Sequence, residues 1–94
     1  MKFEWDYKKE AINIKKHGIS FEIAQNIFND PFQLTIPDIL HSNDEERWIT
    51  VGLVDKNLIV TVCHTYRDKY GEELMRIISA RKATPKERRE YHRR

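Results

Sequence analysis

The chain has 94 residues, of which 39% are hydrophobic and 34% charged, and its net charge is +2. A chain of this length typically forms one domain, and we expect a single domain over residues 1–94. No apolar run approaches the roughly 20 residues of a transmembrane helix, and the N-terminus lacks the apolar core of a signal peptide. The single cysteine, Cys63, excludes a disulfide framework and a multi-cysteine metal site. These features favour a cytoplasmic protein.

Charge is distributed unevenly along the chain. Over residues 76–94 eight basic residues stand against two acids, whereas acids gather in the middle of the chain at Asp38, Asp44, Glu45 and Glu46. The pattern indicates one surface that attracts phosphate and another that repels it or accepts a basic partner. A solvated basic helix at the C-terminal end is an equally good interpretation of charge alone.

Two helices are predicted first. One runs from Tyr7 to about Lys16, capped by Asp6 and closed by His17-Gly18. We expect its narrow apolar stripe to face the core; that stripe comprises Tyr7, Ala11 and Ile14. The other runs from Phe21 to about Asn29, capped by Ser20 and ended by Asp30-Pro31. Its predicted core residues are Phe21, Ala24, Ile27 and Phe28.

The apolar period then changes to two, which is typical of strands. Four strands are predicted, at about residues 32–36, 46–54, 58–66 and 73–82, joined by a loop over 38–45, a turn over 55–57 and a loop over 67–72. A short strand over residues 2–4 could extend the sheet edge. The last element is a helix that begins with the capping box Thr84-Pro85-Lys86-Glu87. Because Tyr91 is its single substantial apolar group, we expect that helix to be loosely docked or docked on another molecule.

The fold class is therefore α+β: two N-terminal helices, a meander of about four antiparallel strands and a C-terminal helix, with the helices on one sheet face. Symmetric closure of the hairpins would place Trp48 beside His64, and His64 beside Arg76. A one-residue slip would send each side chain to the other face. Arg76 and Arg81 should also point to different faces unless a bulge intervenes.

That row of side chains is suited to cleaving RNA through its 2′-hydroxyl. His64 could act as acid or base, Arg76 could grip the phosphate, and Trp48 could stack a base. A structural role for His64 and Trp48 is equally compatible with the sequence. The further catalytic candidates are Arg81, Glu46 and Arg47. The further candidates for RNA contact are Lys16, His17 and Lys82, although Lys16 and His17 are better explained as cations at a helix C-terminus.

The sequence predicts neither a cofactor nor a metal site, because the four histidines lack zinc-ligand spacing and the three glycines are isolated. The residues alone thus indicate a small α+β domain with a basic end, a charge pattern compatible with binding nucleic acid.

A resemblance adds to this. The stretch FEWDYKKEAINIKKHGISFEIAQNIFNDP resembles the opening of the BrnT toxin family, with its W-D start, its N-x-x-K-H-G helix end, its F-x-x-A and its D-P. The stretches DEERWITVGL, HTYR and RIISARKATPKERREY resemble later parts of that family in the same order. Together they cover nearly the whole chain. The loop over residues 68–72 looks longer than the hairpin usual in the family.

The resemblance implies a RelE-like ribonuclease that arrests growth by cleaving RNA. It also implies neutralisation by a BrnA-type antitoxin with a ribbon-helix-helix DNA-binding part, in a two-plus-two heterotetramer that reaches operator DNA through the antitoxin. A different hypothesis is a non-catalytic binding partner or co-repressor of such a DNA-binding protein.

Overall fold

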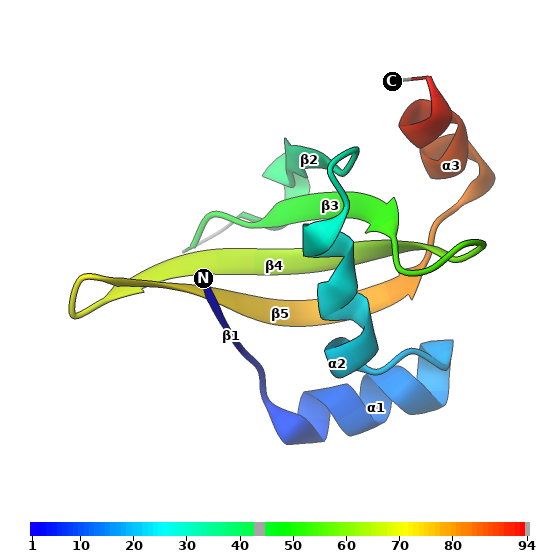
Figure 1. Ribbon diagram of the computed structural model, residues 1–94. Helices are drawn as coiled ribbons and strands as arrows, with labels where there is room; N and C mark the ends of the chain where they lie inside the picture. The colour runs from blue at the N-terminus through cyan, green and yellow to red at the C-terminus, as the bar shows by residue number, and fades with distance from the viewer. Residues whose placement is uncertain (43–44, 94) are drawn as a thin grey trace.

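The computed structural model describes residues 1–42 and 45–93. A five-stranded sheet in the order β1-β5-β4-β3-β2 forms its centre (Figure 1). The elements are β1 (Lys2–Glu4), α1 (Tyr7–His17), α2 (Phe21–Ala24), the 3₁₀ turn η1 (Gln25–Asn29), β2 (Leu34–Pro37), the 3₁₀ turn η2 (Ile39–His41), β3 (Trp48–Leu53), β4 (Ile59–Lys69), β5 (Glu72–Lys82) and α3 (Pro85–His92).

The predicted α+β layout is confirmed. Strands β2 to β5 form an antiparallel meander, and β1 adds to its edge in parallel with β5. The predicted caps are also present: the side chains of Asp6, Ser20 and Thr84 accept backbone N–H bonds at the starts of α1, α2 and α3. Asp44 and Arg94, which contribute to the predicted charge clusters, lie outside the described residues.

The prediction for the buried face of α1 is wrong. Tyr7 and Ile14 are exposed, at 78% and 43%, whereas the buried residue of the helix is Asn13. The Asn13 amide donates to the Ala80 carbonyl at 2.8 Å and accepts from the Ala80 N–H at 3.2 Å, so it docks α1 on β5. Glu10 on the same face accepts the Phe21 N–H at 2.8 Å. Hydrogen bonds to backbone, rather than apolar burial, therefore orient this helix.

The main core lies between α2 and the sheet. Phe21, Ala24 and Ile27 are fully buried there, as predicted, and Phe28 is half-buried. Gly52 of β3 allows η1 to approach closely, because a Cβ at this position would lie 2.8 Å from the Cβ of Ile27. The core thus occupies the sheet face that carries Gly52, Val60 and Val62.

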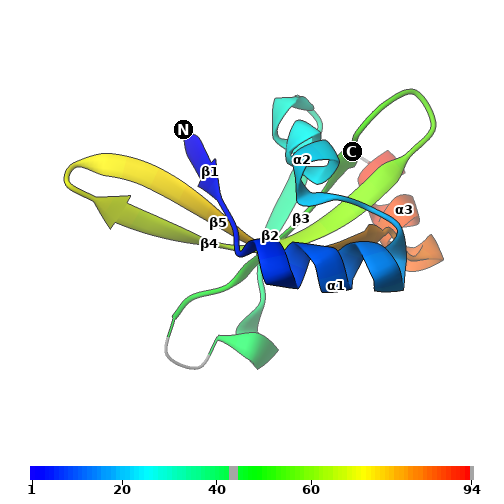
Figure 2. The ribbon, with the colours of Figure 1, turned by 90° about the horizontal axis from the view of Figure 1, so that it is seen from below.

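The predicted loop over residues 67–72 is instead part of one long hairpin. β4 continues to Lys69 and β5 begins at Glu72, so the connection consists of Tyr70 and Gly71. Both residues have positive φ, 55° and 76°, which suits a tight two-residue turn between twisted strands. The hairpin extends beyond the helices in Figures 1 and 2. The sequence of this hairpin end is polar, so the apolar alternation that predicts a strand is absent there. Its two strands pair in register but bury few side chains.

A bulge in β5 sets the faces of that strand. His64 pairs with Ile77 and Cys63 pairs with Ser79, so that Ile78 is the extra residue. Ile77 and Ala80 both belong to the core beneath the helices. Because side chains alternate, Arg76 and Arg81 both point away from that core, which is the outcome expected if a bulge intervened.

The C-terminal helix packs on the other side of the sheet, contrary to the prediction that the helices share one face. Tyr91 is buried against Val51, Ile59 and Ala83, whose strand positions alternate with those beneath α2. Its hydroxyl donates to Asp30. Figure 2 shows the same separation for the η2 segment, which lies across the sheet from α2. The face opposite α2 therefore carries both η2 and α3, while α1 lies along the free edge of β5.

Candidate functional site

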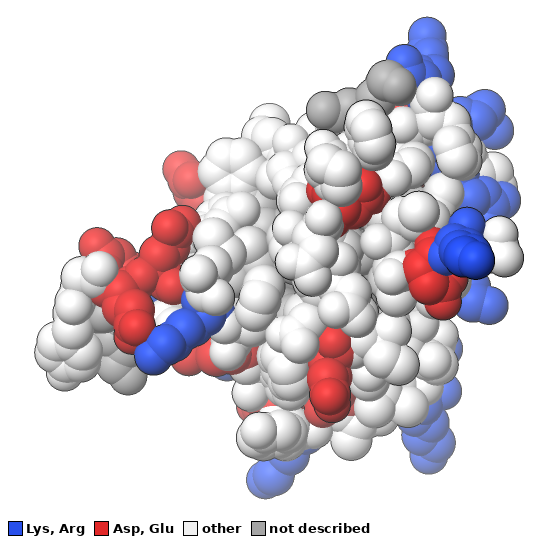
Figure 3. Space-filling view, in the orientation of Figure 1, with Lys and Arg blue, Asp and Glu red and all other residues white. Residues whose placement is uncertain are grey.

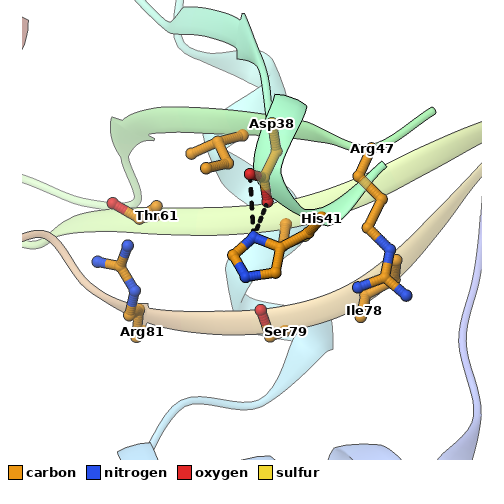
Figure 4. Close-up of a pocket in the computed structure, with 9 residues that line it drawn as sticks. Asp38, His41, Arg47, Thr61, Ile78, Ser79 and Arg81 are labelled. Carbon is orange, nitrogen blue, oxygen red and sulfur yellow. Dashed lines mark hydrogen bonds and ion pairs between the residues drawn. The ribbon is translucent and has the colours of Figure 1, made fainter. Parts of the chain in front are cut away.

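A pocket of about 280 Å³ opens on the sheet face opposite α2. It lies between η2 and the strands β3, β4 and β5, and its polar side chains converge on its mouth (Figure 4). The lining residues are Asp38, His41, Arg47, Ile49, Thr61, Cys63, Ile78, Ser79 and Arg81.

An aspartate and a histidine form a pair at the rim of this pocket. His41 is the last residue of the turn η2 and Asp38 immediately precedes the turn, three residues before the histidine. The Nδ1–H of His41 donates to the Asp38 carboxylate, at 2.9 and 3.0 Å to its two oxygens. Asp38 is buried, whereas the His41 side chain is 66% exposed. A carboxylate that binds Nδ1 fixes the imidazole tautomer and leaves Nε2 for other chemistry.

The same turn also positions an arginine. The Ser42 hydroxyl donates to the Asp38 carbonyl at 2.7 Å and accepts the Arg47 N–H at 2.9 Å. The Asp38 N–H donates to the Arg47 carbonyl at 2.8 Å. These bonds join the start of η2 to the entry of β3, so the Arg47 side chain lies across the pocket from the histidine (Figure 4).

The second arginine of the pocket is held by α3. Arg81 donates to both carboxylate oxygens of Glu87, at 2.7 and 3.0 Å. Glu87 also accepts the Thr61 hydroxyl and the Thr84 N–H, each through Oε1. Burial opposes ionisation of Glu87, but the hydrogen bonds from Arg81, Thr84 and Thr61 outweigh it and lower its pKa to about 2. The bonds to Glu87 raise the pKa of Arg81.

The floor of the pocket is formed by small side chains of β4 and β5. Cys63 and Ser79 pair across these strands, and Thr61 lies two residues before Cys63. Burial, and then the charge of Asp38, raises the pKa of the Cys63 thiol, so it is not an activated nucleophile. The reactive character of the pocket therefore rests on the imidazole and the two guanidinium groups at its rim.

Only part of the predicted row of side chains is formed. Trp48 does pair with His64, but the bulge places Ile77 rather than Arg76 beside that histidine. His64 is fully buried, its ring packs edge-on against Phe28, and its Nε2 bonds the Thr50 hydroxyl at 2.7 Å. Burial lowers its pKa to about 4. Because no polynucleotide can reach it, His64 is a core residue and not a catalytic candidate.

Arg76 and Trp48 also lie outside the pocket. Arg76 is half-buried beside Thr65 and lines a separate hollow with Glu4, Trp5 and Asp6. Trp48 shares the face of His64 and contacts Tyr66, with ring centroids 6.2 Å apart. The bulge thus separates Arg76 from the Trp48–His64 pair, with which a regular meander would have aligned it.

Of the remaining candidates, the pocket brings together Arg47 and Arg81. Glu46 is exposed at the approach to β3, beside Arg47 in sequence. Lys16 and His17 lie in the last turn of α1, on the helix-covered side, and Lys82 is exposed at the end of β5.

Sequence reasoning missed the Asp38–His41 pair. Both residues fall in the segment that was predicted as a polar loop, where no period indicates which side chains meet. The D-x-x-H spacing was the available signal, because a single helical turn brings positions three apart to one side. This spacing is a weak signal by itself. It is the hydrogen bonds from Ser42 to Asp38 and from Arg47 to Ser42 that hold the turn against the start of β3.

Among residues 1–42 and 45–93, no three His, Cys, Asp or Glu side chains gather in a way that could hold a metal ion. None of the helices described is long and apolar enough to span a membrane.

The structure is thus a small α+β protein whose five-stranded sheet carries an imidazole and two guanidinium groups, donors of the kind that bind phosphate, over one open face. The family profile described as "Ribonuclease toxin, BrnT, of type II toxin-antitoxin system" matches residues 5–87. The chain therefore belongs to the BrnT family of ribonuclease toxins, as the resemblance indicated.

A solved structure is also similar. The 1.1 Å crystal structure of the Brucella abortus ribonuclease toxin BrnT matches with a TM-score of 0.65 and 26% sequence identity, over 89% of this chain and 97% of that one. A search of curated protein sequences gave no significant match. The similarity supports the α+β fold and the ribonuclease toxin family, and it leaves the choice of catalytic residues to the geometry of the pocket.

Proposed function

We propose that this chain is a metal-independent, RelE-like endoribonuclease, and that the pocket beneath η2 is its active site. The observation that carries the proposal is the convergence of His41, Arg47 and Arg81 on one open cavity, with Asp38 orienting the histidine. Of the residues chosen from sequence, Arg47 and Arg81 are retained, and His41 takes the role first considered for His64.

The proposed reaction is an attack by the 2′-hydroxyl of RNA on the adjacent phosphate. Nε2 of His41 accepts the hydroxyl proton, the 2′-oxygen forms a bond to phosphorus, and the bond from phosphorus to the 5′-oxygen breaks. The leaving oxygen takes a proton from water in the open pocket. Arg47 and Arg81 contact the phosphate oxygens, where charge increases in the transition state. Arg81 keeps free N–H donors for this, since Glu87 occupies two of its five.

The toxin class implies an antitoxin partner. We propose, from the resemblance, a BrnA-like ribbon-helix-helix antitoxin, a two-plus-two heterotetramer and operator binding through the antitoxin. Free toxin would then arrest growth in the cytoplasm by cleaving RNA. The exposed apolar side chains of Ile39 and Leu40, which immediately precede His41, are consistent with a partner that covers the pocket.

The test is cleavage of a single-stranded RNA by purified chain in the presence of EDTA. Wild-type protein should cleave, and His41→Ala should lower the rate by about 10²- to 10⁴-fold, the usual contribution of general acid–base catalysis. Arg47→Ala should also lower the rate. Arg67→Ala is the matched control. Arg67 lies on the β4–β5 hairpin and pairs with Glu4 of β1, so its replacement should leave cleavage intact.

Two outcomes would count against the proposal. Full activity of His41→Ala would exclude the assigned base, and loss of activity in EDTA that added metal restores would exclude the metal-independent reaction. Failure of the folded wild-type chain to cleave any RNA, together with normal growth on expression, would favour the non-catalytic co-repressor.

A further inference from the structure

The outward face of α3 is a row of cations. Residues 85, 88, 89, 92 and 93 lie on one side of this helix and line a shallow hollow formed by Pro85, Arg88, Arg89, His92 and Arg93. Positions four apart rise by about 6 Å along the axis, so Arg88 and His92 follow one another on this face, as do Arg89 and Arg93. Lys and Arg side chains gather over this part of the molecule in Figure 3.

The acids of α3 leave two arginines of this row, Arg88 and Arg89, without an ion pair among the described residues. Glu87 faces the sheet and is occupied by Arg81, Thr61 and Thr84. Glu90 borders a groove beside β2 and reaches Arg93 at 3.3 Å. Within residues 1–42 and 45–93, no acid lies within ion-pair distance of Arg88 or Arg89. Two guanidinium groups are thus left with water as their partner.

The helix that carries this row also borders the pocket. Glu87 joins α3 to the pocket residue Arg81, and Arg88 is the next residue along the helix. Tyr91, buried and bonded to Asp30, fixes the opposite side of the helix against the sheet. A chain of phosphates that enters the pocket at Arg81 therefore meets further cations on a docked support.

We propose that the outward face of α3 is a second binding site, which holds the backbone phosphates of single-stranded RNA beyond the nucleotide that is cleaved. Arg88 and Arg89 are its principal contacts, and Arg93 and His92 extend it. This inference rests on the proposed ribonuclease function, and it adds a substrate requirement: RNA long enough to span the pocket and α3 binds more tightly than a dinucleotide. The contacts are to phosphate, so they carry no base preference.

The test is the affinity of the full chain for a 12-nucleotide single-stranded RNA of mixed sequence with 2′-O-methyl groups, which the proposed 2′-hydroxyl reaction cannot cleave. Affinity is measured over a range of salt concentrations. Each phosphate contact in a single strand contributes about −0.7 to the slope of log K against log salt. Arg88→Gln with Arg89→Gln should therefore make the slope shallower by about 1.4 and weaken binding most at low salt.

Two controls isolate the site. Lys8→Gln with Lys9→Gln makes the same change in net charge on the exposed start of α1, and it should leave the slope unchanged. Arg88→Lys with Arg89→Lys keeps the charge and should keep the slope. Circular dichroism and the thermal midpoint should be nearly the same for all variants, because all four side chains are exposed.

Two results would overturn the proposal. An unchanged slope in the Arg88 and Arg89 double glutamine variant, with RNA still bound and unmodified RNA still cleaved, would reject the second site and leave the ribonuclease intact. If that variant instead lost affinity for the antitoxin alone, the face would be a protein interface. A wild-type chain that neither binds nor cleaves RNA would reject both this site and the proposed function.

Discussion

At the scale of single residues, the buried titratable groups stabilise the fold rather than perform chemistry. His64 lies beneath Phe28, with Nε2 bonded to Thr50, and its Nδ1 has no partner among residues 1–42 and 45–93. The pocket histidine, His41, has the opposite environment, since it is exposed and held by one carboxylate. Two histidines of one small chain therefore differ in role because burial removes one from any ligand.

Burial of His64 predicts a specific pH dependence of stability. Its pKa is about 4 in the folded chain, against 6.5 for an unperturbed histidine. The unfolded chain therefore binds the extra proton, so stability is full above pH 6.5 and is lost as the pH falls toward 4, by roughly 3 kcal/mol in total. Urea denaturation at several pH values should show this loss, and His64→Gln should flatten it. An equal slope in the variant would contradict the assignment.

Glu87 acts in a separate pH window. Its folded pKa of about 2 is depressed below the usual 4.5, so its contribution is present above pH 4.5 and is lost as the pH falls toward 2. The two groups can therefore be separated in one titration of stability, since His64 titrates first as acid is added.

At the scale of elements, polar contacts decide how the helices dock. α1 uses Asn13 and Glu10 against backbone groups, while its apolar residues Tyr7 and Ile14 face water. Of the described residues of α3, Tyr91 is the buried one, as its sequence indicated. Asp30 links the end of η1 to both β3 and α3, because it accepts the Leu53 N–H and the Tyr91 hydroxyl.

Removing the Tyr91 hydroxyl tests the docking of α3. Tyr91→Phe leaves the buried carboxylate of Asp30 without one donor, which typically costs about 1–3 kcal/mol. Urea denaturation should show a loss of that size. Tyr7→Phe is the matched control, because Tyr7 is 78% exposed and has no hydrogen bond to lose. Equal stability of the two variants would mean that the hydroxyl does not hold the helix.

The approach of η1 to β3 gives a second test at this scale. Gly52→Ala would place a Cβ 2.8 Å from the Cβ of Ile27 and 3.1 Å from the Ile27 carbonyl oxygen, so η1 or β3 must shift. We expect a loss of about 1–3 kcal/mol in the free energy of unfolding, the usual effect of overpacking. Gly71→Asn at the hairpin turn is the control, since nothing lies within 4 Å there and asparagine tolerates positive φ. A fully stable Gly52→Ala would contradict the close approach.

At the scale of the whole molecule, the sheet separates a packed side from a functional side. α2 covers one face and α1 lies along the free edge of β5, while η2, α3 and the pocket occupy the other face (Figures 1 and 2). Glu87 joins α3 to the pocket through Arg81, so the position of the last helix bears on the site. A ligand that moves α3 would thus also change the surroundings of Arg81.

This coupling leads to a prediction for the antitoxin complex. Since α3 docks through Tyr91 and Glu87 and is otherwise polar, its amides should exchange by local opening in the free toxin. Antitoxin should raise their protection from hydrogen exchange. The core strand β4 serves as the internal reference, because its buried residues should change little. Equal protection of α3 with and without antitoxin would show that its docking does not depend on the partner.

The sequence alone determined the elements and the family. Helix caps at Asp6, Ser20 and Thr84, the alternation in the strands and the series of family motifs are local patterns, and local hydrogen bonding and periodicity are enough to express them. The sequence also indicated Arg47 and Arg81 as site residues, but it did not indicate which side chains surround them.

The tertiary structure decided which residues meet. One extra residue in β5 moves Arg76 away from His64, and the pairing that fixes this bulge lies between strands distant in sequence. Asn13 docks α1 because the Ala80 backbone lies beside it, and His41 enters the site because η2 folds over the sheet. These contacts depend on register and on partners far along the chain, which no local pattern encodes.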